Sequence, residues 1–171
     1  YFKEFNPVHY DPREWARIAK AAGMKYAVLT TKHHEGFCLF DSKYTDYKIT
    51  NTPFGRDLVK EYVEAFRAEG LRVGFYYSLI DWHHPEFTID RIHPRRMDPD
   101  AEEISSKRDM RIYAEYMRNQ VTELLTNYGK IDIFWFDFSY DDMRGEKWKA
   151  AELVDMVRTL QPGVIIDNRL E

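Results

Sequence analysis

The sequence is poor in cysteine and in long apolar runs, and it has no excess of positive charge. Its single cysteine, Cys38, excludes an internal disulfide framework and a cysteine-based zinc site. A membrane-spanning helix needs about 20 apolar residues, whereas the apolar runs here, such as residues 131–138, are short and contain charges. Lysine and arginine (25) are fewer than aspartate and glutamate (29), so the net charge of −4 argues against nucleic-acid binding through bulk charge.

No stretch rich in glycine, serine or proline divides the 171 residues, so the composition indicates one domain. The chain begins at Tyr1 rather than at a methionine and ends at Glu171, just after a strand-like segment. We therefore expect a segment of a longer protein, whose cellular compartment the sequence leaves unknown.

Aromatic residues make up 16% of the chain, a supply of flat rings that suits both a buried core and a sugar-binding cleft. Near-continuously apolar segments predict strands that are buried on both faces, at residues 25–31, 71–78, 131–137 and 164–168. Amphipathic segments before and between them predict helices at residues 11–22, 56–69, 105–128 and 147–160. Asp11 followed by Pro12 is a typical helix start.

This alternation predicts an α/β fold with a parallel sheet and right-handed crossovers. No glycine-rich phosphate-binding loop follows a strand, which disfavours a dinucleotide-binding doubly wound sheet. Polar residues instead gather where each strand meets its following loop, as at the active-site rim of a (β/α)8 TIM-like barrel. Because such a barrel needs about 200 residues or more, we expect residues 1–171 to form one partial catalytic domain with about half of the strand–helix repeats, and no second domain.

Asp137 is the sharpest catalytic candidate, because it ends an otherwise apolar strand where a buried carboxylate is costly. A carboxylate at the carboxyl end of a barrel strand suits a nucleophile or a general base. The alternative interpretation is that Asp137 caps the following turn, where Asp141 and Asp142 also lie.

Two neighbouring histidines, His33 and His34, follow the first strand. Adjacent residues on an extended chain point in opposite directions, which disfavours a shared metal ion and favours hydrogen bonding to a polyhydroxylated ligand. A bend in the loop would change this geometry. The alternative is a pair of loop histidines, one packed and one solvated. Tyr76 on the second strand and Trp82 in the loop above it each suit either a sugar-facing ring or ordinary packing.

Several motifs occur in order along nearly the whole chain. They are residues 32–40 (KHHEGFCLF), 44–47 (YTDY), 56–59 (RDLV), 74–78 (GFYYS) with 81–82 (DW), 133–137 (IFWFD) and 168–169 (NR). Together they resemble the α-L-fucosidases of glycoside hydrolase family 29. The His-His-Glu-Gly-Phe run and the Trp-x-Asp strand end are the most specific parts.

This resemblance implies a (β/α)8-like catalytic barrel that releases terminal α-L-fucose with retention, through a covalent fucosyl-enzyme in which Asp137 is the nucleophile. It also implies a fucose-binding histidine pair, a sugar-contacting tyrosine and an arginine near the nucleophile. With two tryptophans added as further candidates, the expected substrate contacts are His33, His34, Tyr76, Trp82, Trp135 and Arg169. No metal and no organic cofactor is implied.

The family's acid/base is a glutamate that follows the Asn-Arg stretch by a loop. Glu171 comes only two residues after Arg169, so we do not assign it this role. We expect the acid/base beyond the chain end and the segment alone to be inactive.

The expected partner is a fucosylated glycan or a small α-L-fucoside. Nucleic acid and membrane insertion are not expected, and the oligomeric state is left open. The alternatives are a fucose-recognising module without turnover and a barrel glycosidase acting on another sugar. A metal hydrolase built on His33, His34 and Asp137 is a more distant one.

Overall fold

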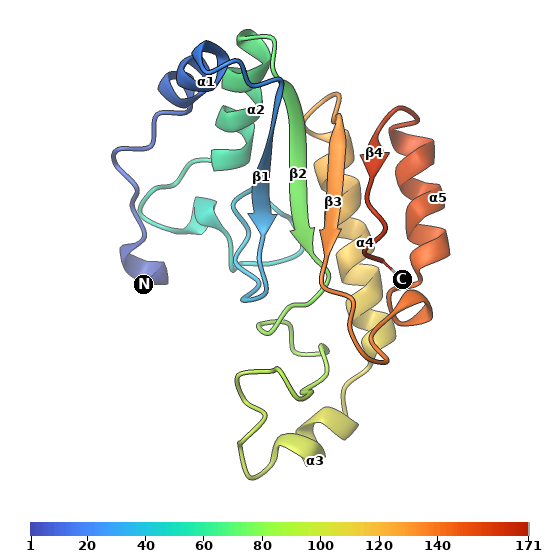
Figure 1. Cartoon of the computed structure of the whole chain (residues 1–171). Coiled ribbons are helices and arrows are strands. Elements are labelled where there is room, and N and C mark those ends of the chain that lie inside the picture. The colour runs from blue at the N-terminus through green and yellow to red at the C-terminus, as the bar shows by residue number, and fades with distance from the viewer. Residues whose placement is uncertain (171) are drawn as a thin grey trace.

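The structure is a computed structural model that describes residues 1–170. Within them a four-stranded parallel sheet forms in chain order, from β1 (Tyr26–Lys32), β2 (Arg72–Ser78), β3 (Ile133–Asp137) and β4 (Ile165–Ile166). Figure 1 shows these strands side by side, running in the same direction. The predicted α/β pattern of parallel strands alternating with helices is confirmed, and the carboxyl ends of the strands lie at one edge of the sheet.

The helices are α1 (Pro12–Ala21), α2 (Leu58–Ala68), α3 (Ala101–Ser106), α4 (Met110–Thr126) and α5 (Ala150–Leu160). Short 3-10 turns lie at Phe2–Glu4, Ile49–Asn51 and Gly145–Trp148. The predicted start of α1 is confirmed, since the Asp11 side chain accepts hydrogen bonds from the backbone N–H groups of Arg13 and Glu14, both at 3.0 Å.

Two predicted helices differ clearly at their starts. The helix predicted at residues 147–160 begins only at Ala150, after the 3-10 turn Gly145–Trp148. The segment predicted as a single helix at residues 105–128 contains the end of α3 and the whole of α4. Asp109 separates the two helices, because its extended backbone and its side chain, which accepts from Arg111 N at 2.9 Å, make it the N-cap of α4. Aspartate favours such a cap over a helix interior.

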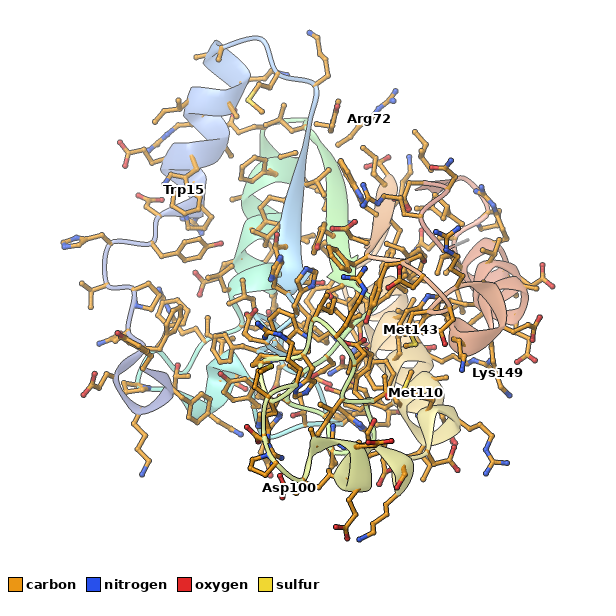
Figure 2. The ribbon with its side chains drawn as sticks, turned by 60° about the horizontal axis from the view of Figure 1, so that its bottom comes forward. Trp15, Arg72, Asp100, Met110, Met143 and Lys149 are labelled. Atoms are coloured by element: carbon orange, nitrogen blue, oxygen red, sulfur yellow. The ribbon has the colours of Figure 1, made fainter. Side chains whose placement is uncertain are left out.

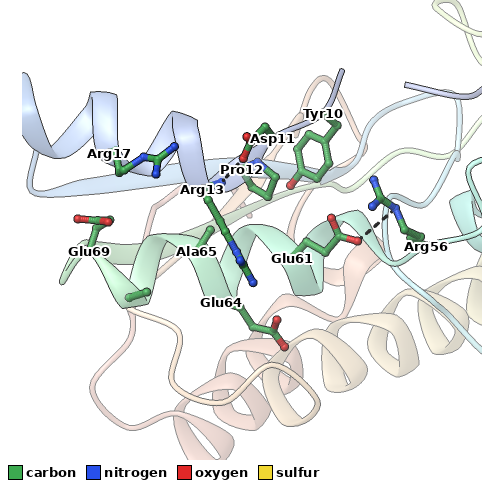
Figure 3. Close-up of a pocket in the computed structure, with 11 residues that line it drawn as sticks. Tyr10, Asp11, Pro12, Arg13, Arg17, Arg56, Glu61, Glu64, Ala65 and Glu69 are labelled. Carbon is green, nitrogen blue, oxygen red and sulfur yellow. Dashed lines mark hydrogen bonds and ion pairs between the residues drawn. The ribbon is translucent and has the colours of Figure 1, made fainter. Parts of the chain in front are cut away.

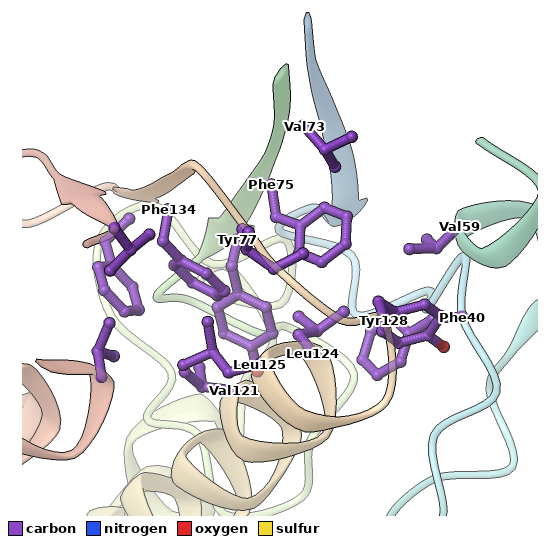
Figure 4. Packing of buried hydrophobic residues seen from close by; sticks show 14 of the residues in the cluster. Phe40, Val59, Val73, Phe75, Tyr77, Val121, Leu124, Leu125, Tyr128 and Phe134 are labelled. Carbon is purple, nitrogen blue, oxygen red and sulfur yellow. The ribbon is translucent and has the colours of Figure 1, made fainter. Parts of the chain in front are cut away.

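The alternation of side chains along β2 divides the sheet into two faces. Val73, Phe75 and Tyr77 are fully buried, and Figure 4 shows them among Val121, Leu124 and Leu125 of α4. Figure 1 shows α2 and α4 on this side of the sheet. Tyr76 has the opposite parity, as do Trp135 and Asp137 on β3, so these three share the other face.

Loops crowd the side of the molecule where the strands end. Figure 2 shows Asp100, Met110 and Met143 on this side, whereas Arg72, the first residue of β2, lies at the opposite end. Functional groups of parallel α/β proteins gather at the carboxyl ends of the strands. The carboxyl ends of β1 to β4 are therefore the expected place of a functional site.

The close approach of β1, β2 and β3 at Gly74 gives a test of the fold. A Cβ added at Gly74 would lie 2.8 Å from Val28 Cγ2 and 3.0 Å from Ile133 Cβ, so Gly74→Ala forces these strands apart. We expect it to lower the free energy of unfolding by about 1–3 kcal/mol. Gly163→Ala is the matched control, because a Cβ there meets nothing within 4 Å, and its effect stays within about 0.5 kcal/mol. Denaturant unfolding of both variants checks this, and equal effects would contradict the packing at Gly74.

Candidate active site

Both side-chain oxygens of Asp137 contact side chains from other segments of the chain, Tyr76 on β2 and Arg169 in the turn after β4. Its Oδ2 accepts a hydrogen bond from the Tyr76 hydroxyl at 2.7 Å. Its Oδ1 lies 2.8 Å from Arg169 Nε, a charge contact rather than a well-aligned hydrogen bond. No backbone N–H of the following turn, within residues 1–170, donates to this carboxylate. The geometry therefore favours an oriented functional carboxylate over a turn cap.

Tyr76 remains protonated as the donor in this contact. Burial, and then the hydrogen bond to Asp137, raise the pKa of the Tyr76 phenol above its ordinary value. The Asp137 side chain keeps 18% of its surface exposed and Arg169 keeps 50%. A carboxylate held by a neutral donor and a permanent cation, with access to solvent, has the properties that a nucleophile needs.

His33 and His34 lie side by side rather than on opposite sides of the chain. Their ring centroids are 3.9 Å apart. Extended geometry does not continue through this pair, because β1 ends at Lys32 and the chain bends at once, as the sequence left open. Gly36 N–H donates to His33 O at 3.0 Å, and Gly36 has a left-handed φ of 82°. The His33 ring also stacks on Tyr76 at 5.8 Å, which joins the histidines to the carboxylate cluster.

The His34 ring is fixed on several sides. Its Nδ1 lies 2.7 Å from Ser78 Oγ, and the rings of Trp82 and Phe138 pack edge-on against it at 5.4 and 4.8 Å. Burial, and then the neighbouring His33, lower the pKa of His34 to about 4. His34 is therefore neutral at neutral pH. Phe138 comes directly after Asp137 and has a left-handed φ of 84°, an uncommon conformation for a residue other than glycine.

The two predicted tryptophans take different places. The backbone N–H of Trp82 donates to the backbone carbonyl of His34 at 2.8 Å, and the Trp82 ring packs on the His34 ring, so Trp82 belongs to the same cluster as the histidines. Trp135 is paired with Tyr76 in the sheet register and is 43% exposed on the same face. Trp135 shares a sheet face with Asp137, two residues further along β3, but the structure gives no contact between their side chains. The sugar-binding roles of these residues stay predictions.

A buried ion pair that the sequence analysis did not single out lies beneath the histidines. Lys32 is fully buried, and its Nζ is 3.1 Å from Asp81 Oδ2. The other oxygen, Asp81 Oδ1, accepts hydrogen bonds from the backbone N–H groups of His83 and His84 at 3.0 and 2.9 Å. The pair thus joins the last residue of β1 to the loop after β2. In the sequence, a lysine at the end of an apolar strand could have indicated this pair, because lysine is rarely buried without a partner.

Asp167 is a second carboxylate near the site that sequence reasoning missed. Its Oδ1 accepts from Phe136 N–H at 3.0 Å, whereas its buried Oδ2 has no partner among residues 1–170. Burial is the main cause that raises the pKa of Asp167 to about 6.

Three further features of the described residues concern metal binding, membrane spanning and a surface groove. Within the described part of the chain, no three His, Cys, Asp or Glu side chains come together in a way that could hold a metal ion. No helix among residues 1–170 is long and apolar enough to cross a membrane. A groove between α1 and α2, shown in Figure 3, is lined by charged side chains that include Arg13, Arg17, Glu61 and Glu64. None of the predicted site residues lines this groove. We therefore take the cluster at the strand ends, which contains the carboxylate, arginine and histidines, as the candidate site.

A parallel α/β sheet with a held carboxylate, an arginine and aromatic rings at its strand ends is an arrangement typical of barrel-class hydrolases. The sequence profile described as alpha-L-fucosidase matches residues 1–171. The chain belongs to this family of glycosidases, as the sequence motifs indicated.

Individual relatives agree with this assignment. Alpha-L-fucosidase 1 of Arabidopsis thaliana is 32% identical over 168 residues, which cover 95% of this chain but 29% of that protein. The solved structure of alpha-L-fucosidase isoenzyme 1 from Paenibacillus thiaminolyticus has a TM-score of 0.94 and 67% identity, covering 99% of this chain and 40% of that one.

A second solved structure is a family 29 alpha-L-fucosidase from Bacteroides thetaiotaomicron, described as a trapped covalent intermediate with 2-fluoro-fucosyl fluoride. It has a TM-score of 0.83 and 37% identity, covering 99% of this chain and 37% of that one. This chain therefore spans less than half the length of each of these relatives.

The Lys32–Asp81 pair gives a stability test. Lys32→Met leaves the Asp81 carboxylate buried without its counter-charge, and we expect a loss of about 3–5 kcal/mol in the free energy of unfolding. Lys107→Met makes the same change in an exposed pair with Glu103, whose side chains are 70% and 72% exposed. The control loses at most about 1 kcal/mol. Denaturant unfolding compares the two, and a small loss at Lys32 would rule out the buried pair.

The raised pKa of Asp167 gives a pH test. The folded protein holds a proton on Asp167 up to about pH 6, whereas the unfolded chain releases it near 3.8. The contribution of Asp167 to stability is thus fully present below the unfolded value and is lost as pH rises through 6. The unfolding free energy of wild type minus that of Asp167→Asn should fall between pH 4 and 7 in a denaturation series. A difference that does not change with pH would show that Asp167 is not buried as described.

Proposed function

We propose that this chain carries the nucleophile and the fucose-binding side of the active site of a retaining α-L-fucosidase. Its substrate is a terminal α-L-fucose on a glycan or a small α-L-fucoside. The observation that carries the proposal is the Asp137 carboxylate at the end of β3, held by Tyr76 and Arg169 beside the paired histidines. Membership of the family supports the substrate, and the trapped intermediate reported for the Bacteroides relative supports the covalent route.

Retention requires two displacements at the anomeric carbon. In the first, Asp137 attacks this carbon while an acid protonates the leaving oxygen, which gives a fucosyl ester. In the second, water attacks the same carbon with help from the same acid/base residue, and the Asp137 carboxylate leaves. Arg169 and Tyr76 orient the carboxylate before the attack and interact with its charge when it returns.

The histidines and tryptophans would bind the sugar rather than react with it. His33 and His34 supply ring nitrogens for hydroxyl groups, while Trp82 and Trp135 supply flat apolar surfaces. Hydrogen bonds that strengthen toward the oxocarbenium-like transition state contribute to rate as well as to binding.

The acid/base is assigned to none of residues 1–170. Glu171, to which we also do not assign it, lies outside the described residues. We propose that residues 1–171 form one partial catalytic barrel domain, that the acid/base lies elsewhere in the protein, and that this segment alone is inactive.

The decisive experiment compares variants of the full-length protein that contains this chain. With 4-nitrophenyl α-L-fucoside, we expect Asp137→Asn to lower kcat by about four orders of magnitude or more, because the covalent route is lost. Asp142→Asn is the control, since Asp142 is an 83% exposed carboxylate in the following loop, and it should retain wild-type turnover. Azide should restore turnover to Asp137→Gly by occupying the vacated place, giving a fucosyl azide of inverted configuration.

Other outcomes separate the alternatives. Near-wild-type turnover by Asp137→Asn would remove Asp137 from the nucleophile role. A folded wild-type protein that binds fucose without turnover would be a recognition module. Faster hydrolysis of galactosides than of fucosides would indicate a glycosidase for another sugar.

A further inference from the structure

A buried hydroxyl group lies between His34 and the turn that follows β2. Ser78 Oγ is 2.7 Å from His34 Nδ1, 2.9 Å from the carbonyl oxygen of Ile80 and 3.2 Å from Ile80 N. Ser78 and Ile80 are both fully buried. The contacts of this hydroxyl are therefore made within the protein.

The numbers of protons and lone pairs on Ser78, His34 and the Ile80 backbone fix the direction of each hydrogen bond. A serine hydroxyl has one proton to donate and two lone pairs that accept. The Ile80 carbonyl can only accept and Ile80 N–H can only donate, so the hydroxyl proton goes to the carbonyl. The remaining lone pair of Ser78 Oγ then faces His34 Nδ1, which must carry a proton and donate it.

The opposite arrangement is unfavourable. If the Ser78 hydroxyl donated to His34 Nδ1, the buried Ile80 carbonyl would lose the donor that the structure places 2.9 Å from it. A buried carbonyl without a donor is costly, and here it would face another oxygen lone pair.

The His34 ring carries one proton on its two nitrogens, and its neighbours prevent the ring from flipping. Burial keeps the ring neutral at neutral pH, despite the nearby Asp137 carboxylate, whose charge acts in the other direction. His33, Trp82 and Phe138 pack around the ring and fix its orientation. A neutral imidazole with its proton on Nδ1 has a free lone pair on Nε2. Among residues 1–170, no group donates to this atom.

We infer that Ser78 is a positioning residue that fixes the Nδ1–H tautomer of His34, so that His34 Nε2 accepts a hydrogen bond from a sugar hydroxyl. The identity of the ligand rests on the proposed function, whereas the position of the proton is a property of the protein alone. The ligand hydroxyl that meets His34 must then be a donor, and its own oxygen stays free to accept from another group.

The proton position is tested on the free, full-length protein by neutron diffraction from crystals exchanged into D₂O near neutral pH. We expect deuterium on Nδ1 of His34 and none on Nε2, with the Ser78 deuterium directed at Ile80 O. Deuterium on Nε2 would overturn the inference. This measurement requires neither substrate nor turnover, so it is independent of the proposed function.

Kinetics of matched serine variants test the positioning role. We expect Ser78→Ala to lower kcat/KM by about 10–100-fold, by analogy with the loss that follows when the partner orienting a metal-bound histidine is removed. Ser78→Thr, which keeps the hydroxyl, should restore most of the activity. Ser106→Ala, at an exposed serine of α3, should change nothing. Unchanged kcat/KM in a folded Ser78→Ala protein would contradict the role, and if that variant does not fold the neutron map of the wild type still decides.

The direction of the hydrogen bond to the sugar is tested with L-fucose analogues and the Asp137→Asn variant, in which only binding is measured. Each ring hydroxyl is replaced in turn by hydrogen and by fluorine, which cannot donate. The same affinities are then measured in a protein that also carries His34→Ala. The hydroxyl that contacts His34 is the one whose replacement weakens binding when His34 is present but has a smaller effect when it is absent. At that position we expect both replacements to weaken binding, because neither fluorine nor hydrogen can donate to His34 Nε2.

Two outcomes would argue against the ligand part. A fluorinated analogue that keeps the parent affinity while the deoxy analogue loses it would show that His34 donates, which overturns the inference. Absence of fucose binding by any form would overturn the ligand part together with the proposed function, and the neutron map would still decide the tautomer.

Discussion

The arrangement of the strand-end loops depends on one charge pair without solvent access. Lys32 is the last residue of β1 and Asp81 lies in the loop after β2, and removing either would leave a buried charge unpaired. A buried pair adds little net stability over apolar residues, so its main effect is to select one arrangement among several compact ones. Asp81 holds the backbone beyond β2, and Gly36 is required because a Cβ there would lie 2.3 Å from Asp81 Oδ1.

The second constraint is the alternation of side chains along β2 and β3. Tyr77 points toward the helices and is fully buried, where its hydroxyl donates to Gln120 at 2.7 Å. Tyr76, one residue earlier, lies on the opposite face and donates to Asp137 from the neighbouring strand. A shift of one residue in the pairing of these strands would exchange the two tyrosines and remove the donor from the carboxylate. The register of the sheet is thus part of the site.

Much of this could be predicted from the sequence, because the relevant signals are local. Apolar runs located the strands, and Asp11 with Pro12 located the start of α1. The position of Asp137 at a strand end singled it out. Other features depend on contacts between distant residues, such as the pairing of Lys32 with Asp81 and the place of the Ser78 proton. The break before α4 had a local signal in Asp109, but the helical pattern around it masked that signal.

The backbone conformation of Phe138 limits which residues evolution can accept at this position. Its left-handed φ of 84° stores conformational strain next to the carboxylate, and glycine would relieve that strain. Glycine would also remove the ring that packs on His34 at 4.8 Å. Selection for thermal stability and selection for an ordered site therefore act in opposite directions at this position, a stability–activity trade-off confined to one residue.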